Sequence, residues 1–318
     1  KFNQLFLAFL TIAIFITCTS TAKQRPEGGW LWKISGNGLS HPSYLFGTYH
    51  GTYDILYQYT DSIPELHQAF NACSQFAGES ETTSKPTPAQ VGVAIKLPKD
   101  TTYADLLNKE DFHFLDSIVR QSLKSPLNKV YIKPNFLALI LGEIEKGKKL
   151  VDTGYSQSQI DSMKSQVMDI ALEKKAKEKG LTIVGLEGIF DAFVSEKSNL
   201  KKEADELISD LREDDEISPL SFVNTLSDVY RTQNMKSLID FEVKVDSIFR
   251  TSPKLTEIGK RIREDLLKRR NLNWMNKIPE LMKAQPTFIA VGVRHLPGKD
   301  GLIALLLEKG YQVEPIGL

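Results

Sequence analysis

Two histidines of this chain stand in the same local pattern, in which a glycine at the end of an apolar run is followed three positions later by a histidine. The pattern runs from Gly47 to His50 in LFGTYH and from Gly292 to His295 in AVGVRH. Short apolar runs that end in glycine are typical of buried strands, so each histidine is expected just beyond the carboxyl end of a strand. Open α/β sheets bind their ligands at that edge. We therefore predict that His50 and His295 belong to one site.

Two glutamates follow predicted strands in the same way. Glu79 comes after the segment QFAG, and Glu187 comes after LTIVGL. One carboxylate and two neutral imidazoles are suitable ligands for zinc, iron, cobalt or manganese, and an open coordination position admits a water that the metal acidifies. His50, Glu79 and His295 are therefore predicted to bind a divalent metal and to catalyse hydrolysis. The alternative is that each histidine only closes its loop through a hydrogen bond.

Other residues with chemical potential are interpreted as structural. A third glycine-to-histidine string, ending at His41, lies in a predicted turn. His67 and His113 are interpreted as packing or surface histidines, and Cys73 as a buried small hydrophobe without a second cysteine near enough for zinc. The sequence contains no His-Glu-x-x-His, Gly-x-Ser-x-Gly, Cys-x-x-Cys or phosphate-binding Gly-Lys-Ser/Thr string.

The order of the predicted elements indicates an α/β fold. Predicted strands cover residues 30–34, 43–46, 75–77, 181–184, 287–291 and 311–315, and helical segments cover residues 64–72, 103–149, 155–179, about 200–283 and 300–309. The first two strands are expected to form a hairpin, whereas strand, helix, strand successions favour parallel pairing. We predict a mixed, largely parallel sheet flanked by helices. A large helical insertion, about 103–283, separates two strand, Gly-x-x-His, helix, strand units.

The first residues differ in composition from the rest. Residues 1–22 combine a basic start, an apolar run and a small-residue boundary, which is typical of an export signal. Alternatively, a lipoprotein signal ends before Cys18, which is then acylated. Residues 23–29 form a tether and residues 30–318 a single domain in this prediction. The protein is thus expected to be exported, in the periplasm or at the cell envelope, with membrane contact only through such a lipid anchor.

The charge balance argues against a nucleic-acid partner. The chain of 318 residues has 40 acidic and 40 basic side chains and a formal net charge of zero. Proteins that bind nucleic acid usually concentrate a basic excess on one surface. A peptide or another small substrate of the envelope is the partner that we expect.

Several segments together resemble the TraB/GumN family, over residues 30–318. The segments are LFGTYH at 45–50, VMDIAL at 167–172, GLE at 185–187, RN at 270–271, FIAVGVRHLPG at 288–298, GL at 301–302 and KGY at 309–311. This resemblance implies a fold similar to erythromycin esterase and ChaN, kinship with the Tiki metalloproteases, and an active centre formed by the two Gly-x-x-His motifs and a glutamate. By that correspondence His50, Glu79 and His295 are metal-binding or catalytic residues.

Three further residues are candidates for supporting roles. The family usually has small residues where Val293 and Arg294 stand, and its pattern after Gly-Leu-Glu differs from this chain, so Glu187 is either functional or structural. Arg270 is either part of the site or a surface charge at a helix end. Arg294 either holds a substrate carboxylate or faces solvent.

Three functions are consistent with these residues. The first is an exported metal-dependent hydrolase, peptidase-like, in which a metal activates water. The second is a metal-free hydrolase that uses a histidine as general base, as the resemblance to erythromycin esterase implies. The third is a module that binds and sequesters a peptide without catalysis.

Overall fold

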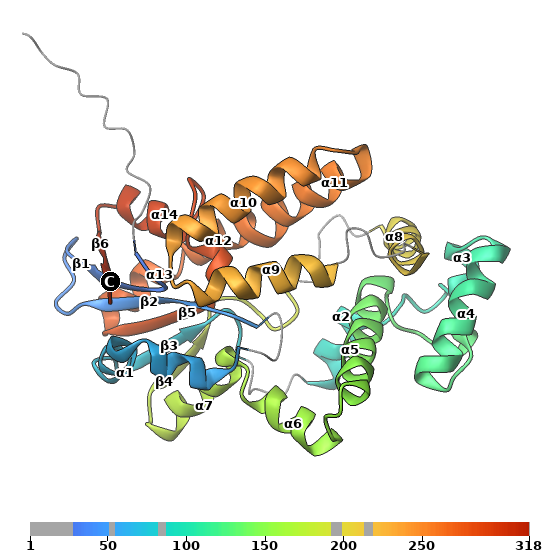
Figure 1. The fold of residues 1–318 in the computed structure, drawn as a ribbon, viewed down its shortest axis with the longest axis horizontal. Coiled ribbons are helices and arrows are strands. Elements are labelled where there is room, and N and C mark those ends of the chain that lie inside the picture. The colour runs from blue at the N-terminus through green and yellow to red at the C-terminus, as the bar shows by residue number, and fades with distance from the viewer. Residues whose placement is uncertain (1–27, 51–54, 82–86, 192–198, 213–218, 318) are drawn as a thin grey trace, which may run out of the picture.

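The computed structural model describes residues 28–50, 55–81, 87–191, 199–212 and 219–317 (Figure 1). The predicted export signal, Cys18 and the tether up to residue 27 lie outside these ranges. Within them, no helix combines the length and the apolar character that a membrane crossing requires.

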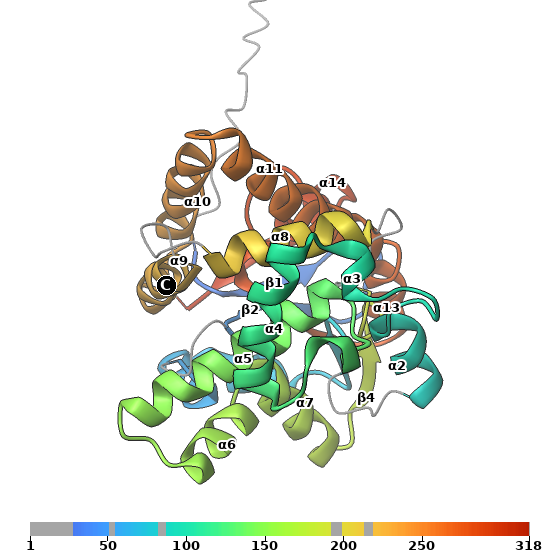
Figure 2. The ribbon, with the colours of Figure 1, turned by 90° about the vertical axis from the view of Figure 1, so that its right-hand side faces the viewer.

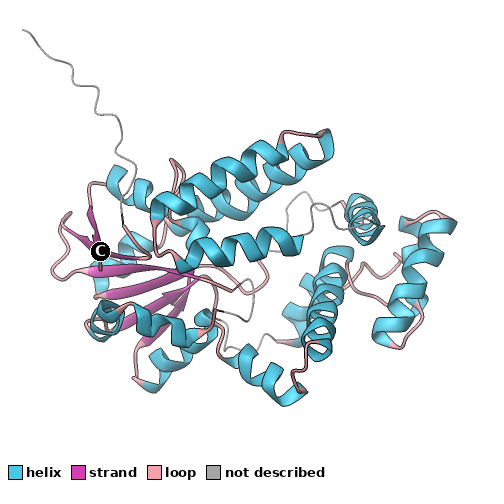
Figure 3. Ribbon diagram, in the orientation of Figure 1, coloured by secondary structure: helices cyan, strands magenta, loops and turns pink. Residues whose placement is uncertain are grey.

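Six strands of the described chain form one sheet (Figure 3). Their order is β4-β3-β5-β2-β1-β6, with β1 (Leu31–Ser35), β2 (Ser43–Thr48), β3 (Gln75–Gly78), β4 (Thr182–Gly185), β5 (Thr287–Gly292) and β6 (Gln312–Ile316). The neighbours from β4 to β2 pair in parallel, and only β1 runs antiparallel, to both β2 and β6. The predicted fold class, a mixed and largely parallel sheet with an opening hairpin, is confirmed.

Burial explains why the central strands are so apolar. All six residues of β5, TFIAVG, are buried, and β2 is buried at five of its six positions. Strands that are covered on both faces read as continuous apolar runs, whereas the outer strands β4 and β6 are partly exposed. The register aligns Thr48 with Gly292 and Gly78 with Ala290, so the carboxyl ends of β2, β5 and β3 meet at one edge.

Helices lie on both faces of the sheet (Figures 1 and 3). α1 (Pro64–Asn71) and α7 (Met168–Glu178) lie on one face, and α10 (Met235–Phe249), α12 (Arg269–Trp274), α13 (Ile278–Ala284) and α14 (Leu302–Glu308) on the other. The connection after β2 therefore leaves to one face and the connection after β5 to the other. Such a change of side between neighbouring parallel strands opens a crevice at their carboxyl ends, where α/β proteins bind ligands.

A second hydrophobic cluster lies away from the sheet (Figure 1), and its helices stand in front of the strands in the view of Figure 2. It joins α3 (Tyr103–Leu106), α4 (Lys109–Leu123), α5 (Pro134–Asp152) and α8 (Leu200–Arg212). The remaining helical elements are η1 (Tyr57–Ser62), α2 (Pro88–Ile95), η2 (Leu127–Lys129), α6 (Gln157–Ser165), α9 (Pro219–Arg231), α11 (Pro253–Arg261), η3 (Ile262–Lys268) and η4 (Val293–His295).

The single helix predicted over 155–179 is wrong, because the chain forms two helices there. α6 ends at Ser165, and Val167 adopts an extended ψ of 134° before α7 begins. The carbonyl of Gln166 accepts a hydrogen bond from the N–H of Tyr57 at 2.7 Å instead of continuing a helix. This break lets Met168 enter the main core and turns the first residues of α7 toward the sheet edge.

A π-helical segment, η3, connects α11 to α12. The N–H of Arg269 donates to the carbonyl of Glu264, five residues back, which is the hydrogen-bond spacing of a π-helix. None of the residues of η3 is buried, whereas Arg270, Asn271 and Trp274 of α12 are. The π-helical turn therefore ends where α12 begins and its side chains become buried.

Candidate active site

The three predicted site residues lie around one point, the α-carbon of Gly292 at the end of β5. A β-carbon at that glycine would be 3.2 Å from Glu79 Oε1, 3.4 Å from His50 Cε1 and 3.7 Å from His295 Cδ2. The N–H of Gly292 donates to Glu79 Oε1 at 2.7 Å. Absence of a side chain at this position is therefore what allows the three groups to approach one another.

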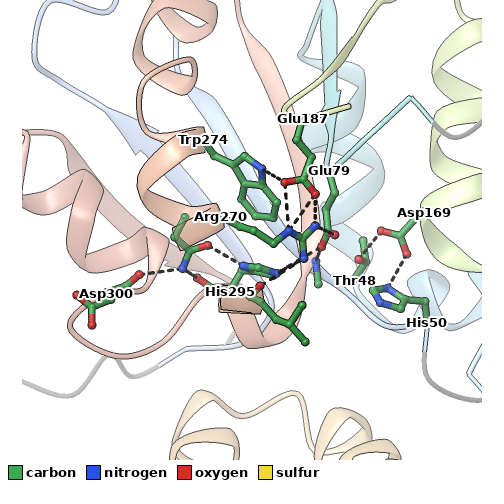
Figure 4. A network of polar contacts seen from close by, with 12 residues as sticks. Thr48, His50, Glu79, Asp169, Glu187, Arg270, Trp274, His295 and Asp300 are labelled. Atoms are coloured by element: carbon green, nitrogen blue, oxygen red, sulfur yellow. Dashed lines mark hydrogen bonds and ion pairs between the residues drawn. The ribbon is translucent and has the colours of Figure 1, made fainter. Parts of the chain in front are cut away.

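Arg270 occupies the centre of the polar cluster that Figure 4 shows. Its Nη2 lies 2.6 Å from Glu79 Oε2, its Nε lies 2.9 Å from Glu187 Oε1, and its Nη1 lies 3.3 Å from His295 Nε2. Only 10% of the Arg270 side chain is exposed, so it is not a surface charge at a helix end. We call Glu79, Glu187, Arg270 and His295 the Arg270 network.

Glu187 is held inside this network from two sides. Besides the guanidinium, the indole Nε1 of Trp274 donates to Glu187 Oε2 at 3.1 Å. The guanidinium carbon of Arg270 lies 4.7 Å from the centre of the Trp274 ring, within the range of a cation–π contact. Both oxygens of Glu187 thus have partners, and its contacts are those of a residue that orients Arg270.

Glu79 carries a stabilised negative charge. Burial raises the pKa of this carboxyl, but His295, Arg270 and His50 together with the Gly292 N–H outweigh burial and lower the pKa to about 2. Glu79 is therefore ionised over the whole physiological range of pH.

His295 is neutral and held in one tautomer. Asn271 Nδ2 donates to the carbonyls of His295 and Asp300, so Asn271 Oδ1 faces His295 Nδ1 at 2.7 Å and accepts a hydrogen bond from its N–H. The unprotonated Nε2 atom then accepts a hydrogen bond from Arg270 Nη1 at 3.3 Å. Burial, together with the charge of Arg270, lowers the pKa of His295 to about 3 despite the opposing effect of Glu79.

His50 has the opposite electrostatic environment. Its Nδ1 lies 3.2 Å from Asp169 Oδ2, and Asp169 Oδ1 accepts a hydrogen bond from Thr48 Oγ1 at 2.7 Å. Desolvation would lower the pKa of His50, but Asp169 and Glu79 raise it to about 9. The His50 side chain is 55% exposed, so this imidazole can reach a substrate.

Asp169, Asn271 and Thr48 are site residues that sequence analysis did not single out. Asp169 lies in the first turn of α7, inside the segment VMDIAL, and Asn271 follows Arg270 directly. Both therefore stood within segments that resemble the family, but nothing in their local spacing indicated which histidine each would contact.

Arg294 neither points freely into solvent nor lies in the site, because it forms an ion pair with Glu242. Its Nε and Nη2 atoms lie 2.6 and 2.9 Å from the two carboxylate oxygens of Glu242 on α10. This bidentate ion pair connects the segment that carries His295 to α10.

The residues that were predicted to bind a metal do not fit a coordination shell in this arrangement. Although the three side chains approach Gly292, no group of three His, Cys, Asp or Glu side chains within the described ranges has an arrangement that could hold a metal ion. Instead the guanidinium of Arg270 contacts Glu79 and approaches His295 Nε2. A divalent ion between these ligands would lie beside a fixed positive charge, which disfavours it. The side chains present are suited to hydrogen bonding and proton transfer.

Fold and site together define an α/β protein whose buried Glu and Arg residues adjoin two histidines at the carboxyl edge of a parallel sheet. The chain matches the model of the TraB/PrgY/gumN family over residues 30–315, and it belongs to that family. The resemblance found in the sequence is thereby confirmed. Neither a curated protein nor a solved structure matches the chain.

The Arg270 network predicts a large cost for removing its cation. Arg270→Met should lower the free energy of unfolding by about 3–5 kcal/mol, because Glu79 and Glu187 are left buried without a counter-charge. Arg269→Met is the matched control. The Arg269 side chain is 40% exposed, and its ion pair with Asp265 is as long as 4.0 Å. This change should therefore cost less than about 0.5 kcal/mol. Urea unfolding followed by circular dichroism measures both, and equal costs would contradict the stabilising role of the network.

Proposed function

We propose that this member of the TraB/PrgY/gumN family is a hydrolase in which His50 is the general base. The observation that carries the proposal is the contact between His50 Nδ1 and Asp169 Oδ2 at 3.2 Å, with the imidazole exposed at the crevice. A carboxylate in this position orients the ring and stabilises the imidazolium that forms when the base accepts a proton. The substrate class that we propose is a peptide or another small molecule of the cell envelope.

The other residues of the site have distinct roles in this proposal. His50 takes the proton of the attacking water through its Nε2 atom and returns it to the leaving group as the scissile bond breaks. Asp169, which accepts a hydrogen bond from Thr48, orients the His50 ring throughout. Arg270 supplies a fixed positive charge near the reacting group, where negative charge develops on the attacked oxygen. Glu187 and Trp274 position Arg270, and Asn271 positions His295. None of these steps requires a bound metal.

The pH dependence of hydrolysis tests the role of His50. Since the base must be unprotonated and its pKa is raised to about 9, kcat/KM should rise with pH up to about 9. Asp169→Asn removes the charge that raises this pKa, so the rise should move to lower pH, and the plateau should fall at least about tenfold. Asp161→Asn, at an exposed position of α6, is the control and should leave the profile unchanged. A profile that does not move in Asp169→Asn would assign the titration to another group.

A metal-dependent hydrolase is the second candidate, and the convergence of His50, Glu79 and His295 on Gly292 favours it. In that case purified protein holds about one divalent ion per chain, and His50→Ala and His295→Ala each remove it. We expect instead that hydrolysis survives chelation, and that His50→Ala abolishes turnover while melting within a few degrees of the parent. If the protein holds one metal ion per chain and both substitutions remove it, the metal-dependent mechanism is correct and the general-base proposal is wrong.

Peptide binding without turnover under any condition would favour a sequestering module.

Export is a further part of the proposed function, and it rests on the composition of residues 1–22. Mass spectrometry of protein from the native envelope should find either an amino terminus near Lys23 or an acylated Cys18. Cys18→Ser separates the two forms, because it releases the protein from the membrane fraction only if Cys18 is lipidated. An intact, unmodified amino terminus in the cytosolic fraction would contradict export.

A further inference from the structure

A cavity of about 230 Å³ adjoins the catalytic groups proposed above. It lies between α7 and the ends of β3 and β5, and both His50 and Asp169 line it. Pockets that hold a whole drug-sized ligand measure about 300–1,000 Å³. This cavity is smaller, so it suits one side chain of a substrate rather than an entire molecule.

Apolar residues form the base and one side of the cavity. Phe76 of β3 and Ala290 of β5 are almost fully buried and close its inner end. Val167 and Ile170 of the α7 region form the side, and Ile170 is 36% exposed at the opening. A neutral apolar group placed here would lose water contacts on several sides, which is favourable.

The charged residues of the cavity wall exclude an acidic group. Three carboxylates line the cavity, those of Glu79, Asp169 and Glu173, and the described lining residues include neither lysine nor arginine. Each carboxylate already has a basic partner: Arg270 for Glu79, His50 for Asp169 and Lys177 for Glu173. Glu173, only 1% exposed, lies 3.3 Å from Lys177 Nζ. An added anion would therefore meet three carboxylates, while His50, the basic side chain among the described lining residues, is already paired with Asp169.

We propose that this cavity is the specificity subsite of the enzyme and that it takes a neutral, compact, apolar side chain next to the bond that is cleaved. The proposal rests on the proposed hydrolase function, since it is the position of His50 at the cavity that places the reacting bond there. The substrate class is accordingly narrowed to molecules with an aliphatic or small aromatic side chain, and acidic side chains are rejected.

Binding of two small amides tests the subsite without requiring turnover. N-acetyl-leucinamide should bind the full-length protein at least about tenfold more tightly than the N-acetyl glutamic acid α-amide, which is of similar size but anionic at pH 7. Nuclear magnetic resonance titration measures both dissociation constants and also reports any hydrolysis. Equal affinities, or tighter binding of the acidic amide, would overturn the proposal.

Substitutions at the cavity opening locate the binding. Ile170→Trp should fill the opening and weaken binding of N-acetyl-leucinamide about tenfold or more, whereas Ile170→Ala should widen it and favour N-acetyl-tryptophanamide. Leu307→Trp, at a 51% exposed position of α14, is the matched control and should change neither affinity. Leucinamide binding that is insensitive to both Ile170 changes would place it elsewhere and overturn the subsite.

The same measurements separate this proposal from the hydrolase proposal. If the two amides are discriminated as expected but His50→Ala leaves turnover unchanged, the subsite stands and the general base is wrong. If turnover depends on His50 but the amides are not discriminated, the hydrolase stands and the subsite is wrong.

Discussion

The buried guanidinium of Arg270 is the constraint on which the site depends. An ion withdrawn from water is tolerated only where opposite charge and hydrogen bonds replace its hydration. Arg270 meets that condition with Glu79, which follows β3, and with Glu187, which follows β4. One side chain on α12 therefore fixes the distance between that helix and the loops after two adjacent strands. The position of Glu79 against Gly292 follows from the same fixed geometry.

Burial and neighbouring charges give the two histidines different pKa values. His295 lies against Arg270 in a buried position, and its pKa is lowered to about 3, whereas His50 lies against Asp169 and has its pKa raised to about 9. The same Gly-x-x-His pattern thus produces one histidine whose pKa is lowered and one whose pKa is raised. Pairs of titratable groups driven apart in this way are the usual basis for a division of catalytic roles. The two Gly-x-x-His motifs of this chain therefore place histidines with different chemical roles.

Sequence predicted the parts of this structure that depend on local pattern. The apolar runs around Phe46 and Ile289 identified parallel strands, and glycine at their ends located the edge where His50 and His295 meet. Partners of side chains were not predictable, because Asp169 is 119 positions from His50, and Arg270 is 191 positions from Glu79. The break before α7 escaped prediction for the same reason: a tertiary hydrogen bond from Tyr57, not a proline or glycine, ends the preceding helix.

The π-helical segment before Arg270 has a consequence for how this region can vary among related chains. Each residue of an α-helix advances the side-chain direction by about 100°, so the number of residues between α11 and α12 decides which of them faces the sheet. α11 packs against α10, and η3 lies beside η4, which carries His295. The loss or gain of a single residue in η3 would therefore turn Arg270 away from both of its carboxylates. The length of η3 thus sets the direction in which Arg270 points.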